Sequence, residues 1–217
     1  MAQHLQREIE TLKKKILSLG AAVEKSVRMA MTATENRDAE LANKVISGDT
    51  EIDQLEVNLE EDCLKILALH QPVAIDLRFI IAVLKINSDL ERIGDLAVNM
   101  AERAQFLSGK SPIAIPFDLE GLAIKTQKML RESLDSLVNL DAGLARNVCA
   151  TDDEVDAINR DMYDLVKVAI RTHPEQVDIL IPYLSISRYL ERIADHATNI
   201  AEDVIYMIEG EIARHRS

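Results

Sequence analysis

The chain contains one thirteen-residue segment twice. LERIGDLAVNMAE at residues 90–102 returns as LERIADHATNIAE at residues 190–202, with nine identical positions. The similarity extends upstream at a spacing of 103 residues, where Asp38-Ala39 matches Asp141-Ala142 and Asp49 matches Asp152. An internal repeat of this length indicates a fold built from two similar units. Because the repeat also keeps its carboxylates, it points to a site in each unit.

Composition favours long helices over a sheet. The 217 residues are 47% hydrophobic, enough for a substantial core, but only 3% are aromatic. Seven glycines and five prolines leave few turns, whereas a sheet of this size needs many turns and more aromatic and β-branched residues. The net charge of -12 repels phosphate backbones, so we expect no nucleic-acid partner.

Apolar residues recur every three or four positions and are interrupted by a few breakers, which predicts helices. Residues 108–116 contain two prolines and a glycine and read as a linker between halves. We predict an all-α fold of six helices, forming two pseudo-symmetric three-helix bundles over residues 1–108 and 109–217, packed as one elongated body. The expected helices cover residues 5–46, 49–69, 75–107, 117–149, 151–171 and 177–217.

No stretch approaches the ~20 apolar residues that a membrane-spanning helix needs, and the first residues lack an apolar signal-peptide core. Cys63 and Cys149 are isolated in apolar helical contexts. We therefore expect a cytoplasmic protein with reduced, structural cysteines and no membrane insertion.

Acidic residues four positions apart occur twice in each half. Residues four apart lie on one face of a helix, and the two pairs of a half lie at similar distances on either side of the turn at Pro72. Antiparallel helices would therefore bring four carboxylates together, which requires a cation. Oxygen ligands of this kind suit Mg²⁺, Ca²⁺, Mn²⁺ or iron, and sometimes zinc. The predicted metal ligands are Asp49, Asp53, Glu91 and Asp95 in the first half and Asp152, Asp156, Glu191 and Asp195 in the second.

The same helix stripes continue to polar residues that we assign a supporting role, namely Asn99, Glu102, Asn199 and Asp203. Asn99 and Asn199 are alternatively hydrogen-bond partners between helices. Simpler readings remain open at this point. Asp49 and Asp152 are placed to complement a helix dipole, and residues 151–154 read as a capping box. The acidic pairs also suit a solvated helix face. His70 and His173, each beside a turn, and His196, which points away from Asp195, are not expected to be ligands.

With these residues assembled, the chain resembles the PhoU family over essentially its whole length. The resemblance rests on the doubled Glu-Arg-Ile-x-Asp motif at residues 91–95 and 191–195 and on DLRFIIAVLKI at residues 76–86. It implies two three-helix bundles that bind metal at the eight acidic residues, with iron clusters or zinc as family precedents. The second half departs at residues 177–183, where the counterpart of Arg78 is lost and Pro182 is gained.

The resemblance also implies a role and partners. Family members are cytoplasmic, often dimeric, and help to repress the phosphate-starvation response. Their partners are the membrane sensor histidine kinase of that response and the ATPase subunit of the phosphate transporter. We therefore expect a metal-binding adaptor that forms a homodimer and has no enzymatic activity.

Two other functions compete with this interpretation. A carboxylate-bridged metalloenzyme of the ferritin-like type would need Glu-x-x-His pairs on two helices, and the sequence has none. A purely structural helical scaffold would need no metal. Metal content separates the scaffold from the other two.

Overall fold

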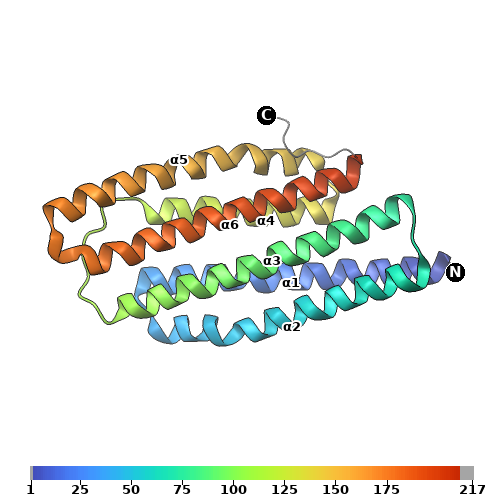
Figure 1. The fold of residues 1–217 in the computed structure, drawn as a ribbon, viewed down its shortest axis with the longest axis horizontal. Helices are drawn as coiled ribbons and strands as arrows, with labels where there is room; N and C mark the ends of the chain where they lie inside the picture. The colour runs from blue at the N-terminus through green and yellow to red at the C-terminus, as the bar shows by residue number, and fades with distance from the viewer. Residues whose placement is uncertain (1, 211–217) are drawn as a thin grey trace.

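The computed structural model describes residues 2–210, which form six long α-helices and one short 3₁₀ turn (Figure 1). Within these residues there is no strand, which confirms the all-α fold predicted from periodicity. The helices are α1 (Ala2–Asn36), α2 (Ala39–His70), α3 (Ala74–Ser108), α4 (Leu119–Asn139), α5 (Ala142–Thr172) and α6 (Val177–Glu209), with η1 (Pro174–Gln176) before α6.

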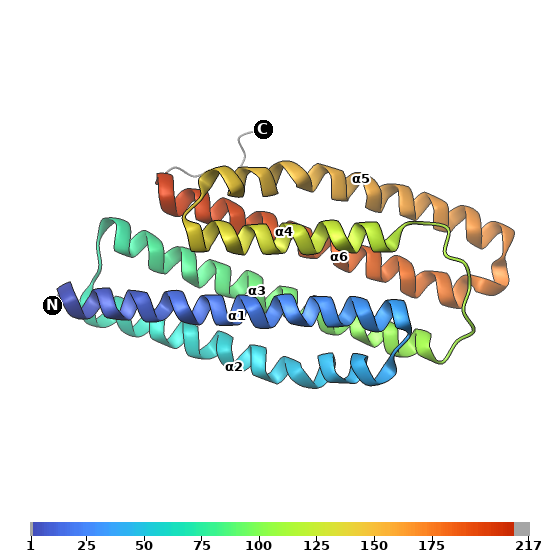
Figure 2. The same cartoon turned by 180° about the vertical axis from the view of Figure 1, so that it is seen from behind.

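The helices form two antiparallel three-helix units that lie side by side along one long axis (Figures 1 and 2). The first unit contains α1, α2 and α3, and the second contains α4, α5 and α6. Helices α3 and α6 lie at the centre, where they pack against each other and against the two other helices of their own unit. Both central helices therefore bury residues on several faces, including Leu90 and Ile93 on α3 and Leu190 and Ile193 on α6.

Two helix boundaries differ from those predicted. The first helix ends at Asn36 rather than near residue 46, because Arg37 adopts a left-handed conformation with φ of 54°. Asp38 then begins α2, and its carboxylate accepts hydrogen bonds from the backbone N–H groups of residues 40 and 41. Gly48, which reads as a helix breaker, lies inside α2.

The corresponding helix boundary in the second half also differs from the predicted one. Helix α4 ends at Asn139 rather than near Cys149, since Leu140 has φ of 51°. Asp141 begins α5, and its carboxylate accepts a hydrogen bond from the backbone N–H of Leu144. The repeated Asp-Ala pairs at residues 38 and 141 are therefore the two helix starts.

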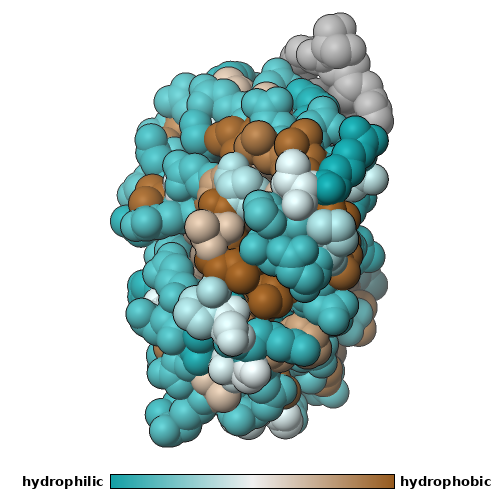
Figure 3. Space-filling view, turned by 90° about the vertical axis from the view of Figure 1, so that its left-hand side faces the viewer, coloured by the Kyte–Doolittle hydropathy of each residue, from teal (hydrophilic) through white to brown (hydrophobic). Residues whose placement is uncertain are grey.

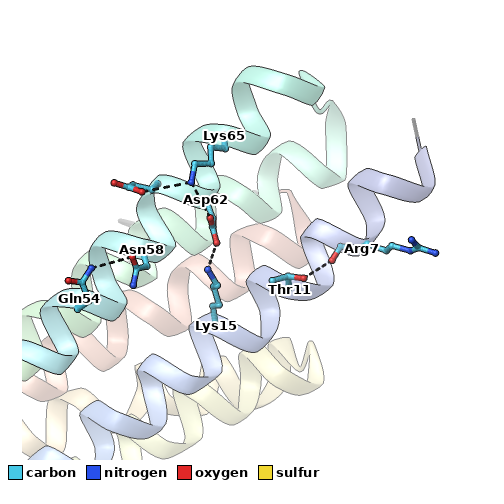
Figure 4. Close-up of polar contacts among 8 residues, drawn as sticks. Arg7, Thr11, Lys15, Gln54, Asn58, Asp62 and Lys65 are labelled. Carbon is cyan, nitrogen blue, oxygen red and sulfur yellow. Dashed lines mark hydrogen bonds and ion pairs between the residues drawn. The ribbon is translucent and has the colours of Figure 1, made fainter.

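Polar contacts on the surface tie neighbouring helices together. Lys15 on α1 pairs with Asp62 on α2, and Asp62 also faces Lys65, 3.8 Å away (Figure 4). The end of the molecule that carries the α3–α4 connection and the α5–α6 turn shows separate apolar patches among hydrophilic side chains (Figure 3). None of the helices described between residues 2 and 210 has the length and apolar content needed to cross a membrane.

Both cysteines are free thiols, as the sequence predicted. Cys63 is buried on α2, and burial raises the pKa of its thiol to about 12. Cys149 is half-buried on α5, where burial and then the charges of Glu202 and Asp152 raise its pKa to about 11. Both thiols stay protonated at neutral pH and are poor nucleophiles.

Candidate metal centres

The turn at Pro72 brings the two acidic pairs of the first half together. It reverses the chain between α2 and α3, so that Asp49 lies beside Gly94. A Cβ atom at Gly94 would lie 3.6 Å from Oδ1 of Asp49 and 3.2 Å from Cγ2 of Ile52. Helices α2 and α3 therefore approach closely at the point where their carboxylates meet. We call Asp49, Asp53, Glu91 and Asp95 the first acidic cluster.

The carboxylates of the first acidic cluster interact electrostatically across the two helices. Burial raises the pKa of Asp49, and the charges of Asp53 and Asp95 raise it further. Burial also raises the pKa of Glu91, with added contributions from Asp95, Glu56 and Asp53, while Arg92 opposes the shift. Like charges held in a half-buried place disfavour ionisation of each other. The four residues therefore influence one another across α2 and α3, and their role as metal ligands stays a prediction.

The second acidic cluster, Asp152, Asp156, Glu191 and Asp195, is built in the same way from α5 and α6. Burial raises the pKa of Asp152 to about 6, and the charges of Asp195 and Asp156 contribute next. The pKa of Asp195 is raised by burial and then by Asp156. For Glu191, burial and then Asp195 raise the pKa, while Arg188 lowers it. This cluster therefore also carries more negative charge than its surroundings compensate.

One carboxylate oxygen of the second acidic cluster has no hydrogen-bond partner. It is Oε2 of Glu191, which is shielded from solvent, whereas the carboxylate of Asp152 interacts with the hydroxyl group of Thr198. A buried unsatisfied carboxylate oxygen is costly, and a bound cation would satisfy it. In the part of the chain that the structure describes, no three His, Cys, Asp or Glu side chains already stand in a coordinating arrangement. Ion binding would therefore require side-chain rotation within a cluster whose chemistry suits hard cations.

The capping interpretation of Asp49 and Asp152 is wrong. Both residues lie in helix interiors, because α2 begins at Ala39 and α5 at Ala142. Thr151 does not cap a helix either, since its hydroxyl donates a hydrogen bond to the carbonyl oxygen of Asn147 at 2.8 Å. The helix dipole therefore does not account for these carboxylates.

The supporting residues predicted further along the stripes mostly lie elsewhere. Asp203 is buried and pairs with Lys85 of α3 at 3.0 Å, and Asn199 donates a hydrogen bond to Asp89 of α3 at 3.4 Å. Their assignment to the acidic clusters is therefore wrong, because both face the seam between the units. Glu102 lies 4.0 Å from Arg103 on the surface. Asn99 is half-buried on α3.

His70, His173 and His196 make their polar contacts outside the acidic clusters. His70 ends α2 and its Nε2 lies 2.7 Å from a carboxylate oxygen of Glu8 on α1. His173 follows α5, with Nδ1 3.2 Å from Glu175. His196 instead joins the two units, because its Nδ1 lies 2.8 Å from Oδ1 of Asp89, and both side chains are buried.

Reasoning from the repeat missed residues at which the halves differ. Glu56 is a fifth carboxylate beside the first acidic cluster, and it accepts a hydrogen bond from Asn87 at 2.9 Å. Its counterpart in the second half is Asn159. Conversely, Arg188 lies 4.0 Å from Glu191, whereas the first half has Ser88 at that position. An alignment of the halves position by position would have revealed both differences.

Comparison with known proteins identifies a match in both halves. The PhoU domain family matches residues 16–104 and again residues 119–204. The chain is 38% identical over 217 residues to the phosphate-specific transport system accessory protein PhoU homolog of Pseudomonas aeruginosa, covering 99% of this chain and 89% of that protein. It is 35% identical over 214 residues to the phosphate-specific transport system accessory protein PhoU of Serratia marcescens, covering 96% of this chain and 86% of that protein.

Solved structures agree with the fold. The crystal structure of PhoU from Pseudomonas aeruginosa superposes with a TM-score of 0.91 at 38% identity, covering 95% of this chain and 99% of that one. The crystal structure of the phosphate transport system regulatory protein PhoU from Streptococcus pneumoniae gives a TM-score of 0.86 at 29% identity, covering 96% of this chain and 99% of that one. These relatives are named as accessory or regulatory proteins and not as enzymes.

Proposed function

The chain belongs to the PhoU family, and from this premise we propose that it is a negative regulator of the phosphate-starvation response and a modulator of high-affinity phosphate uptake. Its general role is that of a phosphate-transport accessory protein without catalytic activity, in keeping with how its relatives are named. The regulatory role would be exercised in the cytoplasm by binding other proteins.

Metal binding at the two acidic clusters is the second part of the proposal. The observation that carries it is the buried carboxylate oxygen of Glu191 that has no hydrogen-bond partner, within a cluster of four carboxylates that the first half repeats. Eight carboxylates would hold iron or zinc, with magnesium or manganese as the alternatives. A bound ion would cross-link α2 to α3 and α5 to α6, which stabilises each unit without providing a reactive group.

The proposed partners are the membrane sensor histidine kinase and the ATPase subunit of the phosphate transporter. Exposed apolar side chains around the α2–α3 turn, at Leu69, Val73 and Ile75, support a docking role, because such residues gathered at one end are costly in a free protein. A homodimer remains a prediction from the resemblance. Light scattering coupled to size-exclusion chromatography measures it directly.

Deletion of the gene tests the regulatory role. We expect a phosphate-starvation reporter to become active in phosphate-rich medium and to be silenced again by the wild-type gene. As a control for complementation, a gene carrying the charge-removing change Asp161→Asn should silence the reporter as the wild-type gene does, because Asp161 is exposed on α5 outside the acidic clusters. Reporter activity that stays unchanged on deletion would contradict the regulatory role.

Metal content tests the second part separately. Protein purified without chelator should contain iron or zinc, and the variant Glu91→Ala/Asp95→Ala/Glu191→Ala/Asp195→Ala should contain neither. Equal metal in that variant and in wild type would rule out the clusters as the binding sites. Full reporter repression by a metal-free variant would separate regulation from metal binding.

A further inference from the structure

A hollow of about 510 Å³ opens between α5 and α6, next to the second acidic cluster. Its volume lies within the range typical of small-molecule sites. Two guanidinium groups, a hydroxyl, a phenol and an amide contribute to its wall. The polar lining residues are Asn159, Arg160, Tyr163, Asp164, Ser185 and Arg188.

Both arginines of this hollow are only loosely held by the protein. Arg160 lies 3.8 Å from Asp156, and Arg188 lies 4.0 Å from Glu191, with side chains that are 71% and 67% exposed. Ion pairs this long and this exposed contribute little to stability. The donor groups of both guanidinium ions are therefore free to bind a ligand.

The carboxylate of Asp164 does not cancel this positive charge. It pairs with Lys167, whose Nζ lies 3.2 Å from Oδ1 of Asp164. The same Nζ lies 4.2 Å from the centre of the Tyr163 ring. A third cation therefore stands at the edge of the hollow, although the chain as a whole carries a net charge of -12.

The first half lacks these features at the corresponding positions. Val57 replaces Arg160 and Ser88 replaces Arg188, so both guanidinium groups are absent. Two carboxylates, Glu56 and Glu60, stand in place of Asn159 and Tyr163. The repeat keeps its acidic clusters but reverses the charge of the surface beside them.

We propose that the hollow between α5 and α6 binds a phosphate group, either as inorganic phosphate or as a phosphate monoester. Guanidinium groups bind phosphate oxygens through pairs of parallel hydrogen bonds, and two of them can neutralise a dianion. The volume exceeds that of one phosphate and leaves room beside Tyr163 for the organic part of an ester.

The position of the hollow predicts coupling to the second acidic cluster, a step that rests on the proposed metal binding. The two arginines that bind the anion are those that face Asp156 and Glu191. When an anion occupies the guanidinium groups, these carboxylates lose part of their positive surroundings. Anion binding therefore increases the affinity of the second acidic cluster for a cation, and by linkage the cation increases the affinity for the anion.

Calorimetric titration of chelator-treated protein with inorganic phosphate and with phenyl phosphate tests the anion site. We expect saturable binding with a Kd on the order of 1 mM or tighter. The variant Arg160→Val/Arg188→Ser installs the residues of the first half and should weaken binding at least about tenfold, or about 1.4 kcal/mol. Arg131→Ser is the matched control, because Arg131 is 61% exposed on α4 and lies 3.4 Å from Glu24, away from the hollow.

Binding of both anions supports a phosphate site, and binding of phenyl phosphate alone assigns the site to monoesters. No saturable binding of either, or equal weakening by Arg131→Ser, overturns the proposal. Because the titration is done without metal, its failure is distinct from a failure of the metal centres. Zinc titration with and without phosphate tests the coupling. Phosphate should tighten zinc binding in wild type but not in Arg160→Val/Arg188→Ser. Equal zinc affinity of wild type with and without phosphate would refute the coupling.

Discussion

Replacing Asp152 with asparagine should stabilise the metal-free protein at neutral pH. Asp152 is half-buried, with a pKa raised from 3.8 to about 6, mainly by burial and then by the charges of Asp195 and Asp156. The folded state therefore binds a proton that the unfolded state releases between these two pH values. The resulting destabilisation is absent below pH 3.8, grows as the pH rises, and is complete above about pH 6.

The magnitude follows from this pKa. A rise of this size corresponds to about 3 kcal/mol before solvent screening, and the partial exposure of Asp152 reduces it to about 1–2 kcal/mol. Asp152→Asn removes the charge but keeps the shape, so it should recover this energy at pH 7.5. For a chain of this length, the melting temperature should rise by about 2–8 °C.

Thermal and urea unfolding in the presence of chelator, at pH 4.5 and pH 7.5, measure the effect. The advantage of Asp152→Asn over wild type should be largest at pH 7.5 and small at pH 4.5. Asp161→Asn, on an exposed position of the same helix, controls for the change in net charge. A variant that is no more stable than wild type at pH 7.5, or one matched by Asp161→Asn, would refute the electrostatic account.

Three further predictions concern the first acidic cluster and the packing of the helices. Glu91→Ala/Asp95→Ala should lose metal from one half, by elemental analysis, and should melt no lower than metal-free wild type, because it removes like-charge repulsion. His196→Leu should cost about 2–4 kcal/mol in urea unfolding, since it leaves the buried carboxylate of Asp89 with only the 3.4 Å hydrogen bond from Asn199. Gly94→Ala should cost about 1 kcal/mol in urea unfolding, because its methyl group would lie 3.2 Å from Cγ2 of Ile52, and Ile52→Val, which keeps Cγ2, should relieve little of this cost in a double-mutant cycle.

Much of the fold is predictable from the sequence because a helix repeats its apolar positions over many turns. The six helices, the two units and the turn at Pro72 follow from periodicity and from the repeat. The predicted boundary between α1 and α2 was wrong because Gly48 reads as a helix breaker, whereas in the structure it lies inside α2. The true boundary depends on Arg37 and Asp38, whose backbone conformation has a weak sequence signal.

The acidic clusters were predictable for a different reason, which is that equal distances from one turn bring residues of antiparallel helices side by side. The surroundings of the supporting residues Asn199 and Asp203 were not predictable in this way, because a step of four residues turns the helix by about 40° beyond one full turn. After two or three such steps, Asn199 and Asp203 no longer face α5 but face α3. The arginines of the hollow were missed because attention went to what the halves share rather than to where they differ.

The central pairing of α3 with α6 has a consequence for how the molecule can be divided. The chain passes from one unit to the other only once, through residues 109–118 between α3 and α4. Polar contacts of Lys85 with Asp203 and of Asp89 with His196 join the units without using that connection. Two separately expressed fragments, cut within this segment, should therefore find each other and reassemble, which makes the protein a natural scaffold for split-reporter complementation.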